Sequence, residues 1–284
     1  MTVERQSCPL GCDAGLDRLA IQGAGASYGV CRVCGLIVDM QRPTHAEIRA
    51  QYQNDRSSPS AYYARCEHED LQTFRRRLRL MGRFVPRPGR LLDVGCSTGT
   101  SLVAARALGW QTAGIDPNPV AVQIARERGL DVELGFLGDF KAGDIGGPFD
   151  CVVLSEVLEH LPEPRQALEQ IRSLLLPGGL LLCSTPNAAS RLCRLFQLKS
   201  KEHLYLFSID NLRALVESRG FDICHCQTTS RMRSLAGMEA STTEIGTLLR
   251  WFVAVTCRLG LDVPLSRLMA RVMRDEILTV ARRR

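Results

Sequence analysis

The segment LLDVGCSTGT at residues 91–100 decides the fold class of this 284-residue chain. Its first residues, LLDV, form a short apolar run before a glycine turn, which is typical of a buried strand. Gly95 and Gly99 bracket the turn, and an apolar-periodic helix is predicted over 99–109. Glycines let a ligand approach the backbone, and the helix N-terminus offers unpaired N–H donors. The spacing G-x-x-x-G with no following lysine excludes a phosphate-binding P-loop.

Strands and helices alternate downstream of this segment. Further strands are predicted over 112–116, 131–135, 149–155, 180–185, 221–229 and 276–281, and helices over 119–128, 164–176 and 208–220. Such alternation implies parallel β-α-β units with right-handed crossovers. We therefore expect an α/β fold, a doubly wound and mostly parallel seven-stranded sheet, in which ligands bind at the carboxyl ends of strands.

Several polar residues follow those strand ends. Asp116 closes the second strand about twenty residues after the glycine turn, where a carboxylate can accept both hydroxyls of a ribose. Asp139 and Phe140 follow the third strand and could accept a hydrogen bond from an adenine and stack on it. The fourth strand leads into SEVLEHLPEP at 155–164, and the fifth is LLLCST.

These segments together resemble class I S-adenosylmethionine-dependent methyltransferases. The family motifs are LDVGCGTG, GxDPSP, FDxVxxxxVLEH, LLxPGGxLxxSTPN and HLxxFS. This chain reads LDVGCSTG, GIDPNP, FDCVVLSEVLEH, LLLPGGLLLCSTPN and HLYLFS, over roughly 90–230 and the closing strand. The resemblance implies the Rossmann-like methyltransferase fold and S-adenosyl-L-methionine as cofactor. One departure is Ser97, where the family usually has glycine.

The resemblance also implies positions for the parts of the cofactor. The 95–99 loop and Asp93 would hold the methionine end, Asp116 the ribose and Asp139 the adenine. Glu156 either helps to seat the cofactor or is an exposed glutamate at a helix start. The predicted cofactor-binding residues are Asp93, Gly95, Cys96, Gly99, Asp116, Asp139, Phe140, Ser155 and Glu156.

The cofactor carries the activation in methyl transfer, so the protein must orient the acceptor and remove its proton. His160 lies just past the fourth strand, near the cofactor sulfur in this family's geometry, and a supporting or helix-capping role is its alternative. Glu202 and His203 lie in a loop that forms the acceptor pocket in similar enzymes. They match a Glu-His acid/base pair of some sugar C-methyltransferases with a cysteine-rich N-terminal domain. The predicted catalytic residues are His203, Glu202 and His160.

For three other side chains the sequence allows either a structural or a functional role. His225 lies on an apolar strand between two cysteines and is expected to be structural. Tyr62 and Tyr63 could line the acceptor site, or simply pack.

Four of the twelve cysteines form the pattern C-x3-C-x18-C-x2-C near the N-terminus. It is close to a zinc ribbon, and four thiolates on two turns would give a closed, structural zinc site. Such a site would fold a segment too small to keep its own core. The alternatives are buried or redox-labile cysteines. The predicted metal ligands are Cys8, Cys12, Cys31 and Cys34.

We divide the chain into three predicted parts. Residues 1–42 form the zinc-ribbon-like module, 43–89 a charged helical linker that caps the active site, and 90–284 the methyltransferase domain. A helical insertion at about 235–273 precedes the last strand. It is interpreted as a lid or a dimer surface, or as an interfacial helix on a membrane, where a lipid-linked glycan could be the acceptor.

Composition narrows the location and the partners. With 45% apolar and 23% charged residues the chain is an ordinary globular protein, and no apolar run reaches the roughly 18 residues of a membrane span. No signal peptide is recognised at the start, so we expect a cytoplasmic protein, with peripheral membrane contact left open. The net charge of +6 permits an anionic partner without demanding one.

The function expected is O-methylation of a small-molecule acceptor, a sugar or natural-product intermediate. The large C-terminal domain of sugar C-methyltransferases is missing, which favours oxygen over carbon. A sugar C-methyltransferase, an RNA methyltransferase that uses the zinc ribbon, and a non-catalytic binding module are the alternatives. Nucleic acid is disfavoured, because SEVL lacks the Asn/Asp-Pro-Pro-aromatic set and basic residues are not interleaved with aromatic ones. The oligomeric state is left open.

Overall fold

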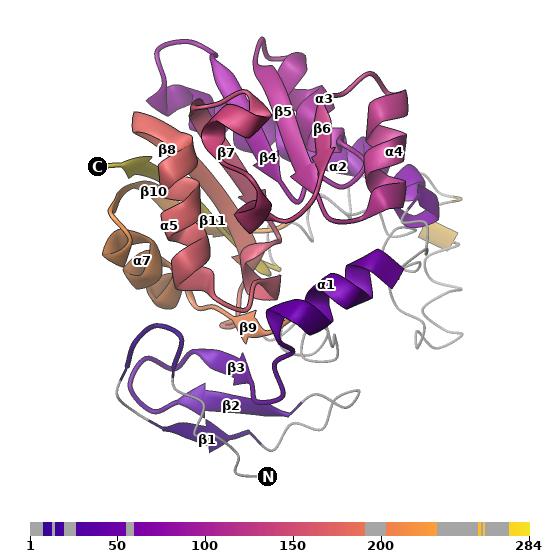
Figure 1. Ribbon diagram of the computed structural model, residues 1–284. Helices are drawn as coiled ribbons and strands as arrows, with labels where there is room; N and C mark the ends of the chain where they lie inside the picture. The colour runs from indigo at the N-terminus through magenta and orange to yellow at the C-terminus, as the bar shows by residue number, and fades with distance from the viewer. Residues whose placement is uncertain are drawn as a thin grey trace.

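The computed structural model describes residues 8–12, 15–19, 27–54, 60–190, 203–231, 255–256, 258 and 273–284, with the backbone alone at 53–54 and 60–65. Two sheets organise these residues (Figure 1). The predicted helical insertion at about 235–273 lies largely outside the described residues. Within the described part of the chain, no helix combines the length and the hydropathy needed to cross a membrane.

The large sheet has seven strands, which confirms the predicted fold class. Its spatial order is β10-β11-β8-β7-β4-β5-β6. The four pairs from β8 to β6 are parallel, whereas β11 is antiparallel to both β8 and β10. The strands are β4 (Arg90–Val94), β5 (Gln111–Asp116), β6 (Val132–Leu134), β7 (Phe149–Ser155), β8 (Leu175–Pro186), β10 (Phe221–Thr229) and β11 (Glu276–Arg283).

Both faces of this sheet are buried, which explains the continuous apolar runs in its strands. Side chains alternate along a strand, so Cys151 and Val153 of β7 join one apolar cluster, and Val152 and Leu154 join the other. The first face packs against α2 (Ser60–Met81), α3 (Thr100–Arg106) and α4 (Pro119–Glu127). The second packs against α5 (Pro164–Leu174) and α7 (Ile209–Ser218).

Helix ends follow local sequence signals. The Asn118 side chain accepts hydrogen bonds from the first turn of α4, whose first residue is a proline. The helix predicted over 164–176 ends at Leu174, and β8 already begins at Leu175. Pro177 accounts for the difference, because a proline disfavours helical backbone in the residue before it. Short 3-10 turns are η1 (Gly82–Phe84), η2 (Leu137–Asp139), η3 (Ala142–Ile145) and η4 (Leu158–His160).

The small sheet has the order β1-β2-β3-β9 and is antiparallel throughout. Its strands are β1 (Leu16–Arg18), β2 (Tyr28–Cys31), β3 (Ile37–Asp39) and β9 (Tyr205–Leu206). The fourth strand comes from the segment that follows β8, so residues far apart in the sequence complete one sheet. We call β1–β3, with the turns that carry the four cysteines, the cysteine module.

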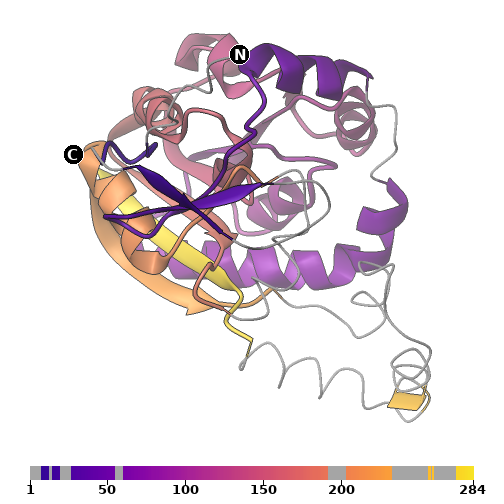
Figure 2. The same ribbon diagram turned by 90° about the horizontal axis from the view of Figure 1, so that it is seen from below.

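Helix α1 (His45–Asn54) leads from the cysteine module to the body of the protein. It lies beside the carboxyl ends of the large sheet's strands in Figure 1. Seen from below, the strands of the small sheet lie across the body and α2 runs along one side (Figure 2). The charged segment predicted as a helical linker over 43–89 therefore contains two helices. Helix α1 lies beside the carboxyl ends of the strands, and α2 covers a face of the sheet.

Candidate active site

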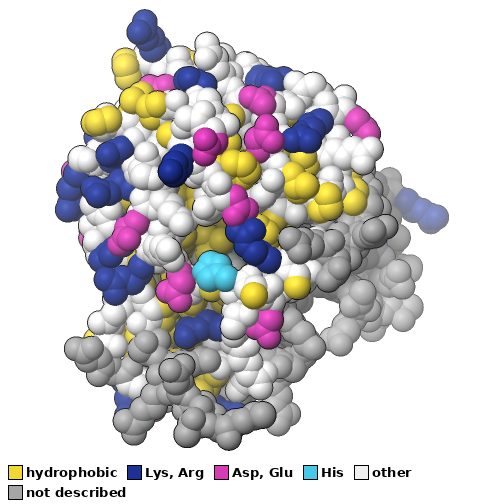
Figure 3. Space-filling view, viewed as in Figure 1, with side chains coloured by type: hydrophobic (Ala, Val, Ile, Leu, Met, Phe, Trp, Pro, Cys, Tyr) yellow, Lys and Arg dark blue, Asp and Glu magenta, His cyan; other side chains and the backbone are white. Residues whose placement is uncertain are grey.

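A cavity of about 500 Å³ opens at the carboxyl ends of β4, β5, β6 and β7. Its volume is that of an ordinary small-molecule site, and its position is where a doubly wound sheet binds ligands. Figure 3 views this side of the molecule and shows a histidine near the middle with acidic and basic side chains around it. The wall contains residues of the glycine turn, of α1 and of the segment after β7.

The turn after β4 has a left-handed backbone at Gly95, Ser97 and Gly99, with φ of 73°, 49° and 83°. The N–H groups of Gly95 and Cys96 both donate to the carbonyl of Ile115 at 2.8 and 3.2 Å, which ties the turn to β5. A Cβ at Gly95 would lie 2.5 Å from a Val157 methyl group. Glycine is thus required there, and the turn presents bare backbone to the cavity.

Asp116 lines the cavity at the end of β5. One carboxylate oxygen accepts from the Ser97 N–H at 2.7 Å and the other from the Asn118 N–H at 2.9 Å. Burial raises the pKa of Asp116, and these two N–H donors lower it in part. Each oxygen keeps acceptor capacity, so the carboxylate can receive hydroxyl groups of a ligand.

Two predicted adenine contacts lie outside the cavity wall as the described residues define it. Asp139 forms an ion pair with Arg49 of α1, and that guanidinium lowers the pKa of the Asp139 carboxyl. Phe140 packs against Gly135 from behind the wall. Phe136, four residues earlier, lines the cavity instead, with the Arg49 guanidinium 4.4 Å from its ring centroid. Asp139 and Phe140 therefore lie next to the segment that lines the cavity, and their contact with an adenine stays a prediction.

Asp93 and Cys96 also lie behind the wall. Asp93 is 3% exposed and accepts a hydrogen bond from the Ser101 hydroxyl. Burial raises its pKa to about 7, with the charge of Asp116 adding to the effect against the lowering by Ser101. Cys96 is buried beside Gly114 of β5. Both residues support the turn, and Gly99 packs against Leu130.

Glu156 lines the cavity with a left-handed backbone, φ 55°. Its carboxylate accepts from Arg231 at 3.2 Å, and Arg231 also pairs with Asp70 of α2 at 2.8 Å. Ser155, predicted to touch the cofactor, instead accepts from buried Arg77 at 2.9 Å. No local sequence signal marks the two arginines, because their partners lie far away in the chain.

Arg77 is 1% exposed and forms an ion pair with Glu276 of β11. Its other amino group donates to Ser184 at 3.0 Å. Burial raises the pKa of Glu276 to about 8, against the lowering effect of Arg77. The charged side chains therefore form a connected buried network directly behind Glu156.

His160 lines the cavity at the end of η4. The His203 ring lies behind it, with ring centroids 4.8 Å apart and His203 8% exposed. Glu159 is fully buried and accepts from the Thr185 hydroxyl at 3.0 Å. Polar atoms of Glu159, His160 and His203 all lie within 4.8 Å of one another. Such a group can pass a proton or hold a divalent cation.

Burial, with the charge of Glu156, raises the pKa of Glu159 well above its ordinary value. Glu159 was not predicted as a site residue from the sequence. Glu202 itself lies outside the described residues, as do the side chains of Tyr62 and Tyr63. His225 lies on β10 opposite Val280 and does not belong to the described cavity wall.

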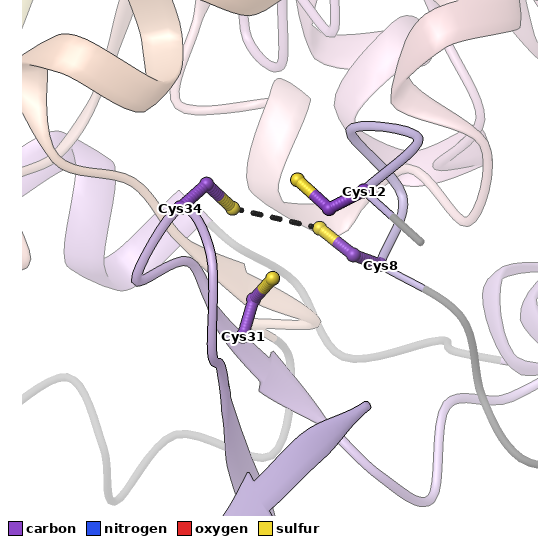
Figure 4. A group of neighbouring side chains, drawn as sticks. All are labelled: Cys8, Cys12, Cys31 and Cys34. Carbon is purple, nitrogen blue, oxygen red and sulfur yellow. Dashed lines mark hydrogen bonds between the residues drawn. The ribbon is translucent and has the colours of Figure 1, made fainter. Parts of the chain in front are cut away.

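The four predicted zinc ligands converge on one point (Figure 4). Their sulfur atoms all lie within 4.8 Å of one another, and those of Cys8 and Cys34 are 3.6 Å apart. Four sulfurs around a tetrahedral zinc lie about 3.8 Å apart, so the donor set and its spacing fit this ion. Burial raises the pKa of the Cys8 thiol to about 11.

Comparison with known proteins supports what the geometry indicates. A family profile described as a methyltransferase domain matches residues 63–225. Two ubiquinone biosynthesis O-methyltransferases are similar in sequence. That of Xanthomonas axonopodis pv. citri (strain 306) is 38% identical over 112 residues, 37% of this chain and 46% of the relative. That of Xanthomonas campestris pv. campestris (strain B100) is 40% identical over 107 residues, 35% and 44%. The chain thus spans less than half the length of these relatives.

Solved structures show the same fold at low sequence identity. The 1,6-didemethyltoxoflavin-N1-methyltransferase of Burkholderia thailandensis, with bound 1,6-didemethyltoxoflavin and S-adenosylhomocysteine, has a TM-score of 0.54 at 15% identity, covering 94% of this chain and 99% of that one. A SAM-dependent methyltransferase from Archaeoglobus fulgidus has a TM-score of 0.53 at 18% identity, covering 78% and 99%. The profile match covers more than half of the chain, and the fold is that of S-adenosylmethionine-dependent methyltransferases. This chain therefore belongs to the methyltransferase domain family.

Proposed function

We propose that this protein transfers a methyl group from S-adenosylmethionine to a hydroxyl group of a small organic acceptor. The observation that carries the proposal is one cavity that joins Asp116 and the 95–99 turn to His160. A nucleoside-binding end and a candidate base thus open into the same space. Methyl transfer needs both within reach of one acceptor.

The residues present fit the cofactor. The Asp116 carboxylate would accept the ribose hydroxyls, and the bare backbone of the 95–99 turn would receive the methionine end. Phe136 and Leu137 supply apolar surface for an adenine. When bound, S-adenosylmethionine would supply an electrophilic methyl group: the acceptor oxygen would gain a bond to the methyl carbon while the carbon–sulfur bond breaks, so that the sulfonium leaves as a neutral thioether. Asp93, Gly99 and Cys96 would act by holding the turn in shape.

His160 is the proposed base, because its ring reaches the cavity. A nitrogen of the imidazole would take the proton of the acceptor hydroxyl. The ring of His203 and the buried carboxyl group of Glu159 lie close to His160 and would orient its ring. Glu156, held by Arg231, would position cofactor or acceptor from the cavity wall.

Two observations support a small-molecule acceptor that is methylated on an oxygen atom. The similar Xanthomonas proteins are named as O-methyltransferases of ubiquinone biosynthesis. The cavity also has the volume of a small-molecule site. A sugar or another natural-product intermediate with a free hydroxyl, including a lipid-linked glycan, is the acceptor class proposed. We further propose that the four cysteines hold one structural zinc ion, because a four-thiolate site leaves no open coordination position.

Transfer of a ¹³C-methyl group tests the proposed reaction. The purified protein is incubated with methyl-labelled cofactor and a panel of phenols, catechols, sugars and bulk RNA, and the products are examined by carbon NMR. We expect an O-methyl resonance with a small hydroxylated acceptor. His160→Asn should lower kcat by about 100-fold, the usual size of a general-base contribution. Label on carbon or on RNA alone, or an unchanged rate in the variant, would overturn the proposal.

A further inference from the structure

We propose that the cysteine module is a positioning element for the His160–His203 pair, and that Tyr28 is the positioning residue that connects them. The inference rests on the proposed function only for its catalytic consequence. Its structural part concerns contacts among described residues and can be tested without any acceptor.

The segment that begins at His203 is held between the cysteine module and the body of the protein. On the module side, β9 pairs with β3, with Ile37 opposite Leu206 and Val38 opposite Tyr205. Just before β9, the Asp39 N–H donates to the Leu204 carbonyl at 2.8 Å. The antiparallel ladder therefore extends up to the residue next to His203.

Tyr28 extends this attachment to His203 itself. Its hydroxyl donates to the His203 carbonyl at 3.3 Å from β2, 175 residues away in the sequence. Tyr28 is fully buried and packs with Ile37 and Leu206 in a small apolar cluster. A buried donor of this kind fixes its acceptor, because leaving either buried polar group unpaired is unfavourable.

On the other side, the same segment is bonded to the turn that carries His160. The Leu204 N–H donates to the Glu159 carbonyl at 2.9 Å. Residue 204 therefore receives a hydrogen bond from β3 and gives one to η4. A displacement of β3 would move His203 relative to the backbone at His160, and the ring separation of 4.8 Å would change with it.

The cysteine cluster closes the hairpin that makes these contacts. Cys31 ends β2, its N–H donates to the Leu36 carbonyl at 2.9 Å, and Val30 lies opposite Ile37 of β3. The Cys34 carbonyl also accepts from the buried side chain of Asn211 at 2.7 Å. The turn that would bind metal is thus three residues from Tyr28 in the chain. Opening the cluster would loosen β2 and β3 together.

NMR of histidine-ring-labelled, full-length protein tests the inference. The variant is Tyr28→Phe, which removes one hydroxyl, and Asp17→Asn is the matched control, because it breaks an exposed ion pair with Arg32 in the same module. We expect the ring resonances of His160 and His203 to shift in Tyr28→Phe at constant pH. The rings of His45, His68 and His225 should keep their positions, and Asp17→Asn should leave all five unchanged. His160→Gln and His203→Gln supply the assignments.

A second experiment on the wild-type protein tests the inference if the Tyr28→Phe variant does not fold. Removing bound metal from wild-type protein with a chelator should shift the same two rings, with zinc content measured on the sample. Unmoved His160 and His203 rings after metal removal, or in a folded Tyr28→Phe variant, would overturn the inference. With a responsive acceptor, Tyr28→Phe should lower kcat about tenfold and leave the cofactor KM unchanged. If no acceptor is ever methylated, the proposed function fails, while the NMR outcome still decides the positioning role.

Discussion

Ser97 adopts a left-handed backbone conformation in the turn that is proposed to bind the cofactor. It occupies a position where similar methyltransferases usually carry glycine, and its φ is 49°. Its N–H donates to Asp116 at 2.7 Å, so this backbone conformation is needed to orient the carboxylate. A left-handed conformation costs a non-glycine residue about 1–2 kcal/mol. The chain therefore carries local strain at the place where the ligand would meet the backbone.

Ser97→Gly should raise the free energy of unfolding by roughly 1 kcal/mol, because glycine adopts this conformation without a Cβ penalty. Chemical denaturation measures the change, and affinity for S-adenosylhomocysteine should stay within about twofold of wild type. Ser173→Gly on α5 is the matched control, and it should destabilise the protein, since its backbone is right-handed helix. Equal destabilisation by both substitutions would contradict the account.

Asp93 makes stability depend on pH. Burial raises its pKa from 3.8 to about 7. The folded chain therefore keeps this proton where the unfolded chain has lost it, so the contribution is fully present below pH 4 and is lost as pH rises towards 7. Asp93→Asn should be more stable than wild type at pH 8, with the gain shrinking steadily towards pH 5. Urea unfolding at several pH values measures it, and a pH-independent difference would refute the assignment.

Individual site residues could be predicted from the sequence where a motif indicated both the element that carries the residue and the direction of its side chain. Gly95, Asp116, Glu156 and His160 line the cavity as strand-end residues should. Asp139 was placed on the correct segment, but η2 turns its side chain towards Arg49. The supporting residues Arg77, Arg231 and Glu159 act through partners up to 199 residues away, and such contacts leave no local pattern.

At the scale of elements, helix α1 supplies a part of the cavity wall that the large sheet does not provide. His45, Ile48, Arg49 and Tyr52 line the cavity from this helix. Arg49 holds it to Asp139 and to the ring of Phe136. Strands β7 and β10 were predicted at their observed bounds, because a proline or a glycine immediately precedes each and marks where it begins. The strands β1, β2 and β9 have two to four residues and no pattern of their own.

Arg49→Gln should speed the release of S-adenosylhomocysteine several-fold without lowering the melting temperature appreciably. The Arg49–Asp139 pair is more than one-third exposed on both sides, so its loss costs at most about 1 kcal/mol of stability. Release is followed by stopped-flow fluorescence. Arg126→Gln, which breaks an exposed ion pair on α4, is the control and should leave release unchanged. A release rate equal to wild type in Arg49→Gln would exclude a role of α1 in retaining the cofactor.

At the scale of the whole molecule, the small sheet and the large sheet are joined through β9 and share an apolar core. The cysteine pattern predicted a metal module, and the alternation of strands predicted the large sheet. Their connection through β9 could not be predicted, because it depends on a two-residue strand and on backbone hydrogen bonds. The module also shares the main apolar core, where Leu36 and Val38 pack with residues of the large sheet. Losing the module should therefore affect the active-site side of the protein as well.

The purified protein should contain close to one zinc ion per chain. Replacing Cys31 and Cys34 with serine should abolish zinc binding and lower the melting temperature by several degrees, because metal binding contributes directly to folding. Elemental analysis and calorimetric melting measure both effects. Cys224→Ser, a half-buried thiol on β10 outside the cluster, should retain zinc. Wild-type protein that contains no zinc and melts at the same temperature as the Cys31 and Cys34 double variant would contradict a structural metal.

The crevice between the 95–99 turn and Asp116 is the proposed binding site of the nucleoside cofactor. Titration calorimetry with S-adenosylhomocysteine tests it most directly, on wild type, Asp116→Ala and the exposed control Asp131→Asn. We predict one site per chain in wild type and in the control. Hydrogen bonds to a charged group contribute about 1.5–3 kcal/mol, so their loss in the Asp116→Ala variant should weaken its affinity for S-adenosylhomocysteine roughly 10- to 150-fold. No binding by wild type, or full affinity in a folded Asp116→Ala variant, would contradict the account.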